Sequence, residues 1–168
     1  QHNNIKLIPF TSQNEILPLL KSKTISGIFF QNPTNIGDTQ NLDWISDIKL
    51  YDKDILLACH TDLMFSTIHE PVGNYPFDFA FGNGCNFGIG LNFGGPQPSF
   101  LVSRKEFIRK IPGKLVGKTI DINDRECYRL ALQTREQFIK REKATSNICT
   151  NQALLANMSV AWAMYNGN

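Results

Sequence analysis

The 168-residue chain has few of the residues that build metal centres and disulfide frameworks. It contains four cysteines (Cys59, Cys85, Cys127 and Cys149) and three histidines, with no CxxC pair and no histidine spacing typical of a metal-ligand set. This scarcity argues against a zinc site and against thioredoxin-type chemistry. It is typical of free thiols in a reducing compartment.

Long hydrophobic runs and a strong charge of one sign are also absent. No run approaches the ~18 apolar residues of a membrane span. The net charge is only +2, and no basic stripe alternates with aromatic residues, so nucleic acid is a poor candidate partner. The chain begins at Gln1 without a signal-like segment, and we therefore expect a piece of a longer protein. Its length and its 42% hydrophobic content are those of about one globular domain. As a piece of a longer protein, the chain is expected to be a single partial domain over residues 1–168.

A glycine-rich loop organises the middle of the sequence. Between residues 78 and 100, six glycines alternate with Phe87, Ile89, Leu91 and Phe93. Apolar residues at this density predict a loop packed on a core, with glycine where a side chain would clash or where φ must be positive. The N–H groups of such a loop can also cradle a phosphate. Because neither GxxxxGK[ST] nor a strand-to-helix GxGxxG is present, we favour packing.

Apolar runs and capping patterns predict an α/β fold. The predicted strands are 25–30, 55–59, 77–81 and 100–102, and 127–132 is either a strand or extended chain. The run 25–30 is continuously apolar, which predicts a strand buried on both faces. Capping patterns at Ser12, Asn41 and Ser103 predict that helices start there. A last helix is predicted from Asn147 to just before Gly167. This order predicts right-handed crossovers and a mostly parallel sheet with flanking helices.

Two polar segments lie at the ends of predicted elements. His60, Thr61 and Asp62 follow the strand 55–59, and ligands of open α/β sheets bind outside the carboxyl ends of strands. The segment 145–150 places small polar side chains at a helix start, where Thr145, Ser146 or Asn147 is predicted to cap the helix.

Several stretches resemble one enzyme family. The segments 130–137 and 141–154 closely resemble glycine decarboxylase, which is also called glycine dehydrogenase (decarboxylating) and is the P-protein of the glycine cleavage system. The segments 87–96 and 111–117 are similar to the same family, and 27–33 and 59–63 match it more loosely. The similarity spans about residues 25–167 and is like the amino-terminal half of the family's long form.

The resemblance implies a cofactor and a fold. The family depends on pyridoxal phosphate and has the aspartate-aminotransferase-like fold, fold type I, of which this chain would be part of the large domain. By resemblance, the cofactor lysine belongs to the other half, and its position corresponds to Cys85 or Asn86 here. Neither side chain can form a stable Schiff base with the cofactor, because that bond requires an amine. No lysine lies between Lys53 and Lys105, so no covalent cofactor is expected on this chain.

The remaining candidate residues follow from the same resemblance. Active sites of fold type I are shared across a dimer interface, so Thr145, Ser146 and Asn147 are candidates for one wall of the site. Arg135 and Arg141 are candidates for attracting the carboxylate of glycine, against the alternative of solvated surface charges.

Two further residues have competing structural interpretations. Asp62 stands where the fold keeps an aspartate for the pyridine nitrogen, although capping of a turn is the favoured interpretation without the lysine. Cys85 as a catalytic thiol is disfavoured against a buried inert thiol, because no histidine is near it in sequence.

The sequence therefore predicts the half of a glycine decarboxylase that lacks the cofactor lysine. This half would form interface and one active-site wall, and alone it would be inactive. Its implied partners are the carboxy-terminal catalytic half and the lipoylated carrier protein. The implied location is the mitochondrial matrix, by resemblance to the eukaryotic long form, or the cytoplasm if the source is bacterial. The alternative is a stand-alone, non-enzymatic relic that acts as a binding or regulatory module.

Overall fold

A computed structural model describes residues 5–111, 113–133, 137, 139–144 and 152–167. The chain divides into two compact units, residues 1–82 and 83–168, and each is described by itself. The expectation of a single partial domain stays a prediction.

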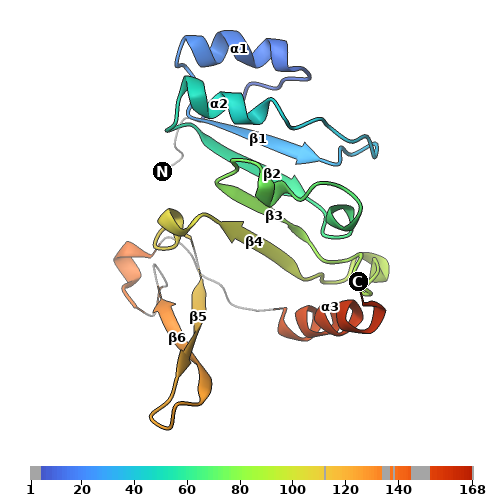
Figure 1. Ribbon diagram of the computed structural model, residues 1–168, viewed down its shortest axis with the longest axis vertical. Helices are drawn as coiled ribbons and strands as arrows, with labels where there is room; N and C mark the ends of the chain where they lie inside the picture. Colours follow the sequence, from blue (N-terminus) through green and yellow to red (C-terminus); the bar gives the residue numbers. More distant parts are fainter. Residues whose placement is uncertain (1–4, 112, 134–136, 138, 145–151, 168) are drawn as a thin grey trace. The chain divides into compact units, whose positions relative to one another are not determined.

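The first unit is built on parallel strands (Figure 1). Strand β1 (Gly27–Asn32) pairs in parallel with β2 (Leu56–Thr61), and β2 pairs in parallel with β3 (Phe79–Asn83). Helix α2 (Ile45–Tyr51) connects β1 to β2, and two short 3-10 turns, η1 (Phe65–Thr67) and η2 (Val72–Asn74), lie between β2 and β3. The predicted α/β architecture with parallel pairing is therefore confirmed for these strands.

The core of this unit lies on one face of the sheet. Helices α1 (Gln13–Lys21) and α2 lie on the same side of β1 in Figure 1. They bury apolar side chains against alternate strand residues; the core comprises Ile16, Leu20, Ile28, Phe30, Leu42, Ile45, Ile48, Ile55, Leu57, Cys59, Val72 and Phe77. Full burial of one such side chain stabilises a fold by about 1.5–3 kcal/mol, so these residues dominate the stability of the unit.

The prediction that 25–30 is buried on both faces is wrong. Burial in β1 alternates along the strand, and Phe29 is 54% exposed while Phe30 is 8% exposed. Phe29 stacks on Phe81, with ring centroids 5.5 Å apart, on the face opposite to the core. The helices that the structure describes in the first unit, α1 and α2, pack on the core face. Within this unit the apolar run is therefore explained by a sheet of which one face is covered.

The capping patterns predict the start of the first helix correctly and the start of the second helix wrongly. Ser12 is the N-cap residue of α1 as predicted, but its side chain makes no capping hydrogen bond to the helix backbone. Its hydroxyl and that of Thr11 instead donate to the Glu15 carboxylate. The prediction that Asn41 caps the second helix is wrong, because α2 begins only at Ile45. The Asn41 Oδ1 instead accepts a hydrogen bond from the Asp43 N–H at 2.8 Å, which forms a turn just before the helix.

The second unit has a different organisation. Strand β4 (Ser99–Ser103) confirms the strand predicted at 100–102, and the antiparallel hairpin β5 (Lys114–Ile120) and β6 (Glu126–Gln133) follows it. The segment 127–132 is thus a strand, while the sequence patterns did not predict β5. The 3-10 turn η3 (Asn92–Gly94) lies before β4, and the 3-10 turn η5 (Arg141–Lys143) lies between β6 and the final helix α3 (Ala153–Asn166).

The helix predicted from Ser103 is absent. The capping pattern of Ser103 and Glu106 precedes only a 3-10 turn, η4 (Lys105–Phe107). Segments this short rarely form α-helices without an apolar face packed on a core, and both Ile108 and the neighbouring basic residues are exposed. The last helix ends just before Gly167 as predicted, and φ of that glycine is +70°. The predicted start of this helix at Asn147 lies outside the described residues.

Candidate functional site

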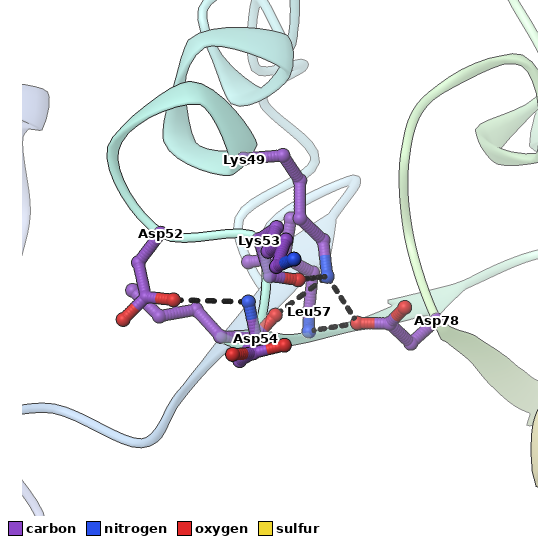
Figure 2. Close-up of polar contacts among 7 residues, drawn as sticks. Lys49, Asp52, Lys53, Asp54, Leu57 and Asp78 are labelled. Carbon is purple, nitrogen blue, oxygen red and sulfur yellow. Dashed lines mark hydrogen bonds and ion pairs between the residues drawn. The ribbon is translucent and has the colours of Figure 1, made fainter.

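A buried ion pair joins α2 to the beginning of β3. The Lys49 Nζ lies 2.9 Å from the Asp78 Oδ2, and the Asp78 side chain is 4% exposed (Figure 2). Lys49 also donates to the carbonyl oxygens of Ile55 at 2.6 Å and Lys53 at 3.4 Å. All three donors of the ammonium group thus have acceptors within the first unit.

The carboxylate of Asp78 also accepts a hydrogen bond from the backbone of strand β2. Its Oδ2 accepts a hydrogen bond from the Leu57 N–H at 2.8 Å, and the Asp78 N–H donates to the Leu57 carbonyl, also at 2.8 Å. A buried pair of this kind is costly to break, because the partner that remains is left charged and poorly hydrated. We therefore assign Lys49 and Asp78 a structural role. Sequence reasoning missed the pair, although a lone aspartate inside the apolar segment 77–81 is a signal that could have revealed it.

Asp62 caps a turn after β2. Its Oδ1 accepts hydrogen bonds from the N–H groups of Met64 at 2.7 Å and Phe65 at 3.1 Å, where η1 begins. This geometry supports the favoured interpretation that Asp62 stabilises local backbone. Oδ1 is already an acceptor for two backbone donors, which leaves it less free to pair with a pyridine nitrogen.

Cys85, one of the two residues predicted to stand at the lysine position, lies in the glycine-rich loop. Its N–H donates to the Asn83 Oδ1 at 3.2 Å, and its Sγ lies 3.6 Å from the Asn86 Oδ1. Its carbonyl accepts hydrogen bonds from the N–H groups of Ile89 and Gly90. The loop therefore turns its own N–H groups toward Cys85, as a packed turn does, and offers a cofactor a thiol and an amide in place of an amine.

The glycine-rich loop packs on α3. Gly84 is buried, and the Ser159 hydroxyl lies 3.5 Å from its carbonyl oxygen. The rings of Phe87 and Trp162 meet edge to face with centroids 5.2 Å apart. A Cβ on Gly88 would lie 2.4 Å from the Trp162 Cδ1, and φ of Gly88 is +80°. Both reasons given for glycine in this loop, close packing and positive φ, therefore apply at Gly88.

Only part of the loop is packed. Ile89 is 6% exposed, whereas Leu91 is 74% exposed and Phe93 protrudes fully into solvent. The expectation that all four apolar residues pack on a core is therefore correct for Phe87 and Ile89 and wrong for the tip of the loop.

Cys59 has the properties of an inert thiol. It is fully buried in β2, and burial raises its pKa to about 11. The thiolate is the reactive form, so this cysteine is almost entirely protonated near neutral pH.

Most of the predicted active-site wall lies outside the described residues. Thr145, Ser146, Asn147 and Arg135 belong to this group, so their proposed roles stay predictions. Arg141 is described, and it is an exposed residue of η5.

Neither a metal cluster nor a membrane-spanning helix occurs in the described ranges. Among those residues no group of three or more His, Cys, Asp or Glu side chains is placed to hold a metal ion. No helix within the described part of the chain is long and apolar enough to cross a bilayer.

Sequence comparisons identify close relatives. A sequence model of the glycine cleavage system P-protein family matches residues 3–168. The chain is 44% identical over 146 residues to the mitochondrial glycine dehydrogenase (decarboxylating) of Homo sapiens, covering 87% of this chain and 14% of that protein. It is 46% identical over 147 residues to glycine dehydrogenase (decarboxylating) of Bdellovibrio bacteriovorus, covering 87% of this chain and 15% of that protein. The chain therefore spans about one seventh of the length of these relatives.

Comparison with a solved structure indicates the same family. The fold is similar to a crystal structure of glycine decarboxylase (P-protein) of the glycine cleavage system in inhibitor-bound form, with a TM-score of 0.76 and 35% identity. The match covers 84% of this chain and 32% of that one. Since the family model matches nearly every residue and the fold agrees, the chain belongs to the glycine cleavage system P-protein family, whose structure places it in fold type I.

Proposed function

We propose that this chain is a large-domain piece of the amino-terminal half of a glycine dehydrogenase (decarboxylating), and that it supplies scaffold and interface. The observation that carries the proposal is the pairing of family membership with Cys85 and Asn86 at the expected lysine position. The parent would decarboxylate glycine in the glycine cleavage system with pyridoxal phosphate held by its other half.

The residues that the structure describes do not fit a covalent cofactor site. A Schiff base requires an amine beside the coenzyme, and no lysine lies between Lys53 and Lys105. Lys49 donates all three of its hydrogen bonds within the first unit, and Asp62 caps a turn. The piece would therefore contribute shape and polar surface to the parent's active site, with no covalent step of its own.

Partners and location follow from the same proposal. The chain would assemble with the carboxy-terminal catalytic half of the parent, and the parent would act on the lipoylated carrier protein. The parent would lie in the mitochondrial matrix if it is eukaryotic, since the human relative is mitochondrial by name, and in the cytoplasm if it is bacterial. Thr145, Ser146, Asn147, Arg135 and Arg141 remain the proposed wall of the active site.

The test compares the piece alone with the piece in a complete enzyme. The isolated chain is mixed with pyridoxal phosphate, reduced with borohydride and analysed by absorbance and peptide mass spectrometry. We expect no Schiff-base band near ~420 nm, no stoichiometric adduct and no release of carbon dioxide from glycine.

In parallel, this chain replaces the matching 147 residues of the Bdellovibrio relative. We expect this chimaera to retain glycine decarboxylation within about tenfold of the relative, which is a loss of about 1.4 kcal/mol in transition-state stabilisation or less. A soluble, folded chimaera without activity would favour the relic. Cofactor capture and decarboxylation by the isolated chain would refute the scaffold role.

A further inference from the structure

The core face of β1 and β2 ends in two buried polar side chains. Burial alternates along both strands, and the last buried position of each is polar. It is Asn32 in β1, which is 4% exposed, and Thr61 in β2, which is 3% exposed. The two residues are Cα partners in the parallel register, and neighbouring strands lie about 4.8 Å apart. Their side chains therefore lie next to each other at the carboxyl edge of the sheet.

The hydroxyl of Thr61 is buried without a protein partner. Its Oγ1 makes no hydrogen bond to any residue that the structure describes. A hydroxyl has one donor and two lone pairs, and burying it unpaired costs free energy. Its own strand offers little, because the backbone of β2 pairs with β1 on one side and with β3 on the other. Since nearly all buried polar groups bond to protein or to ordered water, this hydroxyl indicates a bound molecule.

Asn32 supplies complementary groups beside that hydroxyl. Its Oδ1 accepts a hydrogen bond from the Gln40 N–H at 2.9 Å, which fixes the orientation of the side-chain amide. The Nδ2 of the same amide carries two donors. An amide that donates and a hydroxyl that both donates and accepts can hold one buried water, which typically makes about three hydrogen bonds.

We propose that Asn32 and Thr61 bind one ordered water molecule at the carboxyl edge of the sheet in the first unit. The water accepts a hydrogen bond from the Asn32 Nδ2 and donates one to the Thr61 Oγ1. It thereby joins the ends of β1 and β2, and through the Asn32 amide it connects them to the loop at Gln40. A buried anion would need a charged partner, which neither residue supplies, so the pair fits a neutral molecule. The inference concerns this unit alone and does not depend on the proposed function.

The first test is a crystal structure of the chain at a resolution that shows ordered water. We expect a water peak within about 3.2 Å of both the Thr61 Oγ1 and the Asn32 Nδ2. Thr61→Val keeps the shape of the side chain without the hydroxyl and should lose the peak, whereas Thr61→Ser keeps the hydroxyl and should retain it. No peak in the original chain, or a Thr61 hydroxyl bonded directly to a protein group, would overturn the inference.

The sign of a stability change gives a second test. If the hydroxyl holds a water, Thr61→Val removes a satisfied hydrogen-bonding group, and we expect the urea midpoint of unfolding to fall by about 0.5 M. If the hydroxyl is unpaired, the same substitution removes an unsatisfied buried atom, and the midpoint stays or rises. Thr24→Val, at an exposed threonine of the same unit, is the matched control and should shift the midpoint by less than about 0.25 M. A midpoint of Thr61→Val at or above that of the control contradicts a bound water.

A double mutant tests whether the two side chains share one water. Asn32→Ala removes the amide, and it is combined with Thr61→Val in the same urea experiment. Residues that bond to one molecule are coupled, so we expect the midpoint of the double mutant to fall by less than the sum of the two single falls. Additive falls would show that the two residues act separately and would overturn the shared site. Should Asn32→Ala fail to fold, the crystal structure of the original chain still decides the question.

Discussion

The two units of the chain bury their apolar residues to very different degrees. In the first unit, twelve residues between Ile16 and Phe77 form one buried apolar cluster, and an ion pair is buried beside it. In the second unit, Ile89 is the one large apolar side chain among the described residues that is buried to a similar extent. The first unit has a core of its own, whereas the second leaves most of its large apolar side chains exposed.

The charges are divided as unevenly as the apolar burial. Twelve of the chain's 17 Lys and Arg residues lie in the second unit, all of them between Arg104 and Lys143, against six of its 15 Asp and Glu residues. Helix α3 and the segment 83–103, which includes most of the glycine-rich loop, carry no charge at all. The second unit therefore has two kinds of surface. The charged segment 104–143 is suited to contact with water, and the uncharged α3 and segment 83–103 are suited to contact with protein.

The sharpest test of this contrast is a pair of leucine truncations. Leu57 is 0% exposed and Leu154 is 73% exposed. We expect Leu57→Ala to lower the free energy of unfolding of the isolated chain by about 4 kcal/mol, because it leaves a cavity in a packed core. Leu154→Ala should change it by less than about 0.5 kcal/mol. Urea unfolding followed by far-UV circular dichroism measures both, and similar costs at the two sites would remove the distinction between the units.

The next largest effect is expected at the buried ion pair. Asp78→Ala leaves the Lys49 ammonium and the Leu57 N–H without their shared acceptor. We expect a loss of about 3 kcal/mol, at the lower end for a broken buried pair because the Lys49 side chain is 22% exposed.

Two companion variants separate charge from hydrogen bonding. Asp78→Asn keeps an acceptor for the Leu57 N–H and should cost less than Asp78→Ala in the same urea experiment. Asp54→Ala removes an exposed carboxylate nearby and should change stability by less than about 0.5 kcal/mol. If all three variants unfold at the same urea concentration as the original chain, the ion pair contributes nothing.

The smallest expected effect concerns the glycine-rich loop of the second unit. Gly88→Ala places a Cβ against Trp162 at a positive φ, and we expect it to destabilise the packing of loop and helix by about 2 kcal/mol. Gly90 also has positive φ, +70°, but the described residues beyond its two chain neighbours place no atom within 4 Å of the position that a Cβ would take there. Gly90→Ala should therefore cost only about 1 kcal/mol.

The fluorescence of Trp162 during urea unfolding reports this packing, in a Trp44→Phe background that leaves Trp162 as the one tryptophan. Equal costs for the two glycines would show that close packing on Trp162 adds nothing to the backbone strain.

The sequence predicted the periodic parts of the fold better than the parts that depend on distant contacts. Strands β2 and β3 were located because their apolar runs are bounded by polar residues and turns. Strand β5 was missed because its burial alternates residue by residue along Lys114–Ile120, so its side chains form no continuous apolar run. The burial of one sheet face also depends on what lies over it, which an apolar run does not reveal.

The candidate site was harder to predict than the fold. The turn-capping role of Asp62 follows from its position just after a strand, and local sequence is sufficient for that. The pairing of Lys49 with Asp78 joins residues 29 positions apart, and no local pattern links them. Family resemblance predicts that Cys85 or Asn86 stands at the lysine position, and periodicity alone would have singled out neither residue.

The three hydrogen bonds of the Lys49 ammonium group determine how short a stable fragment of the protein can be. Two of its bonds are local, to carbonyls four and six residues ahead, and only the third reaches Asp78. A truncated polypeptide that ends before residue 78 would retain α1, β1, α2 and β2. Its Lys49 ammonium group, however, would have water in place of the Asp78 carboxylate as its third hydrogen-bond acceptor. The smallest fragment worth expressing for structural work therefore extends through β3.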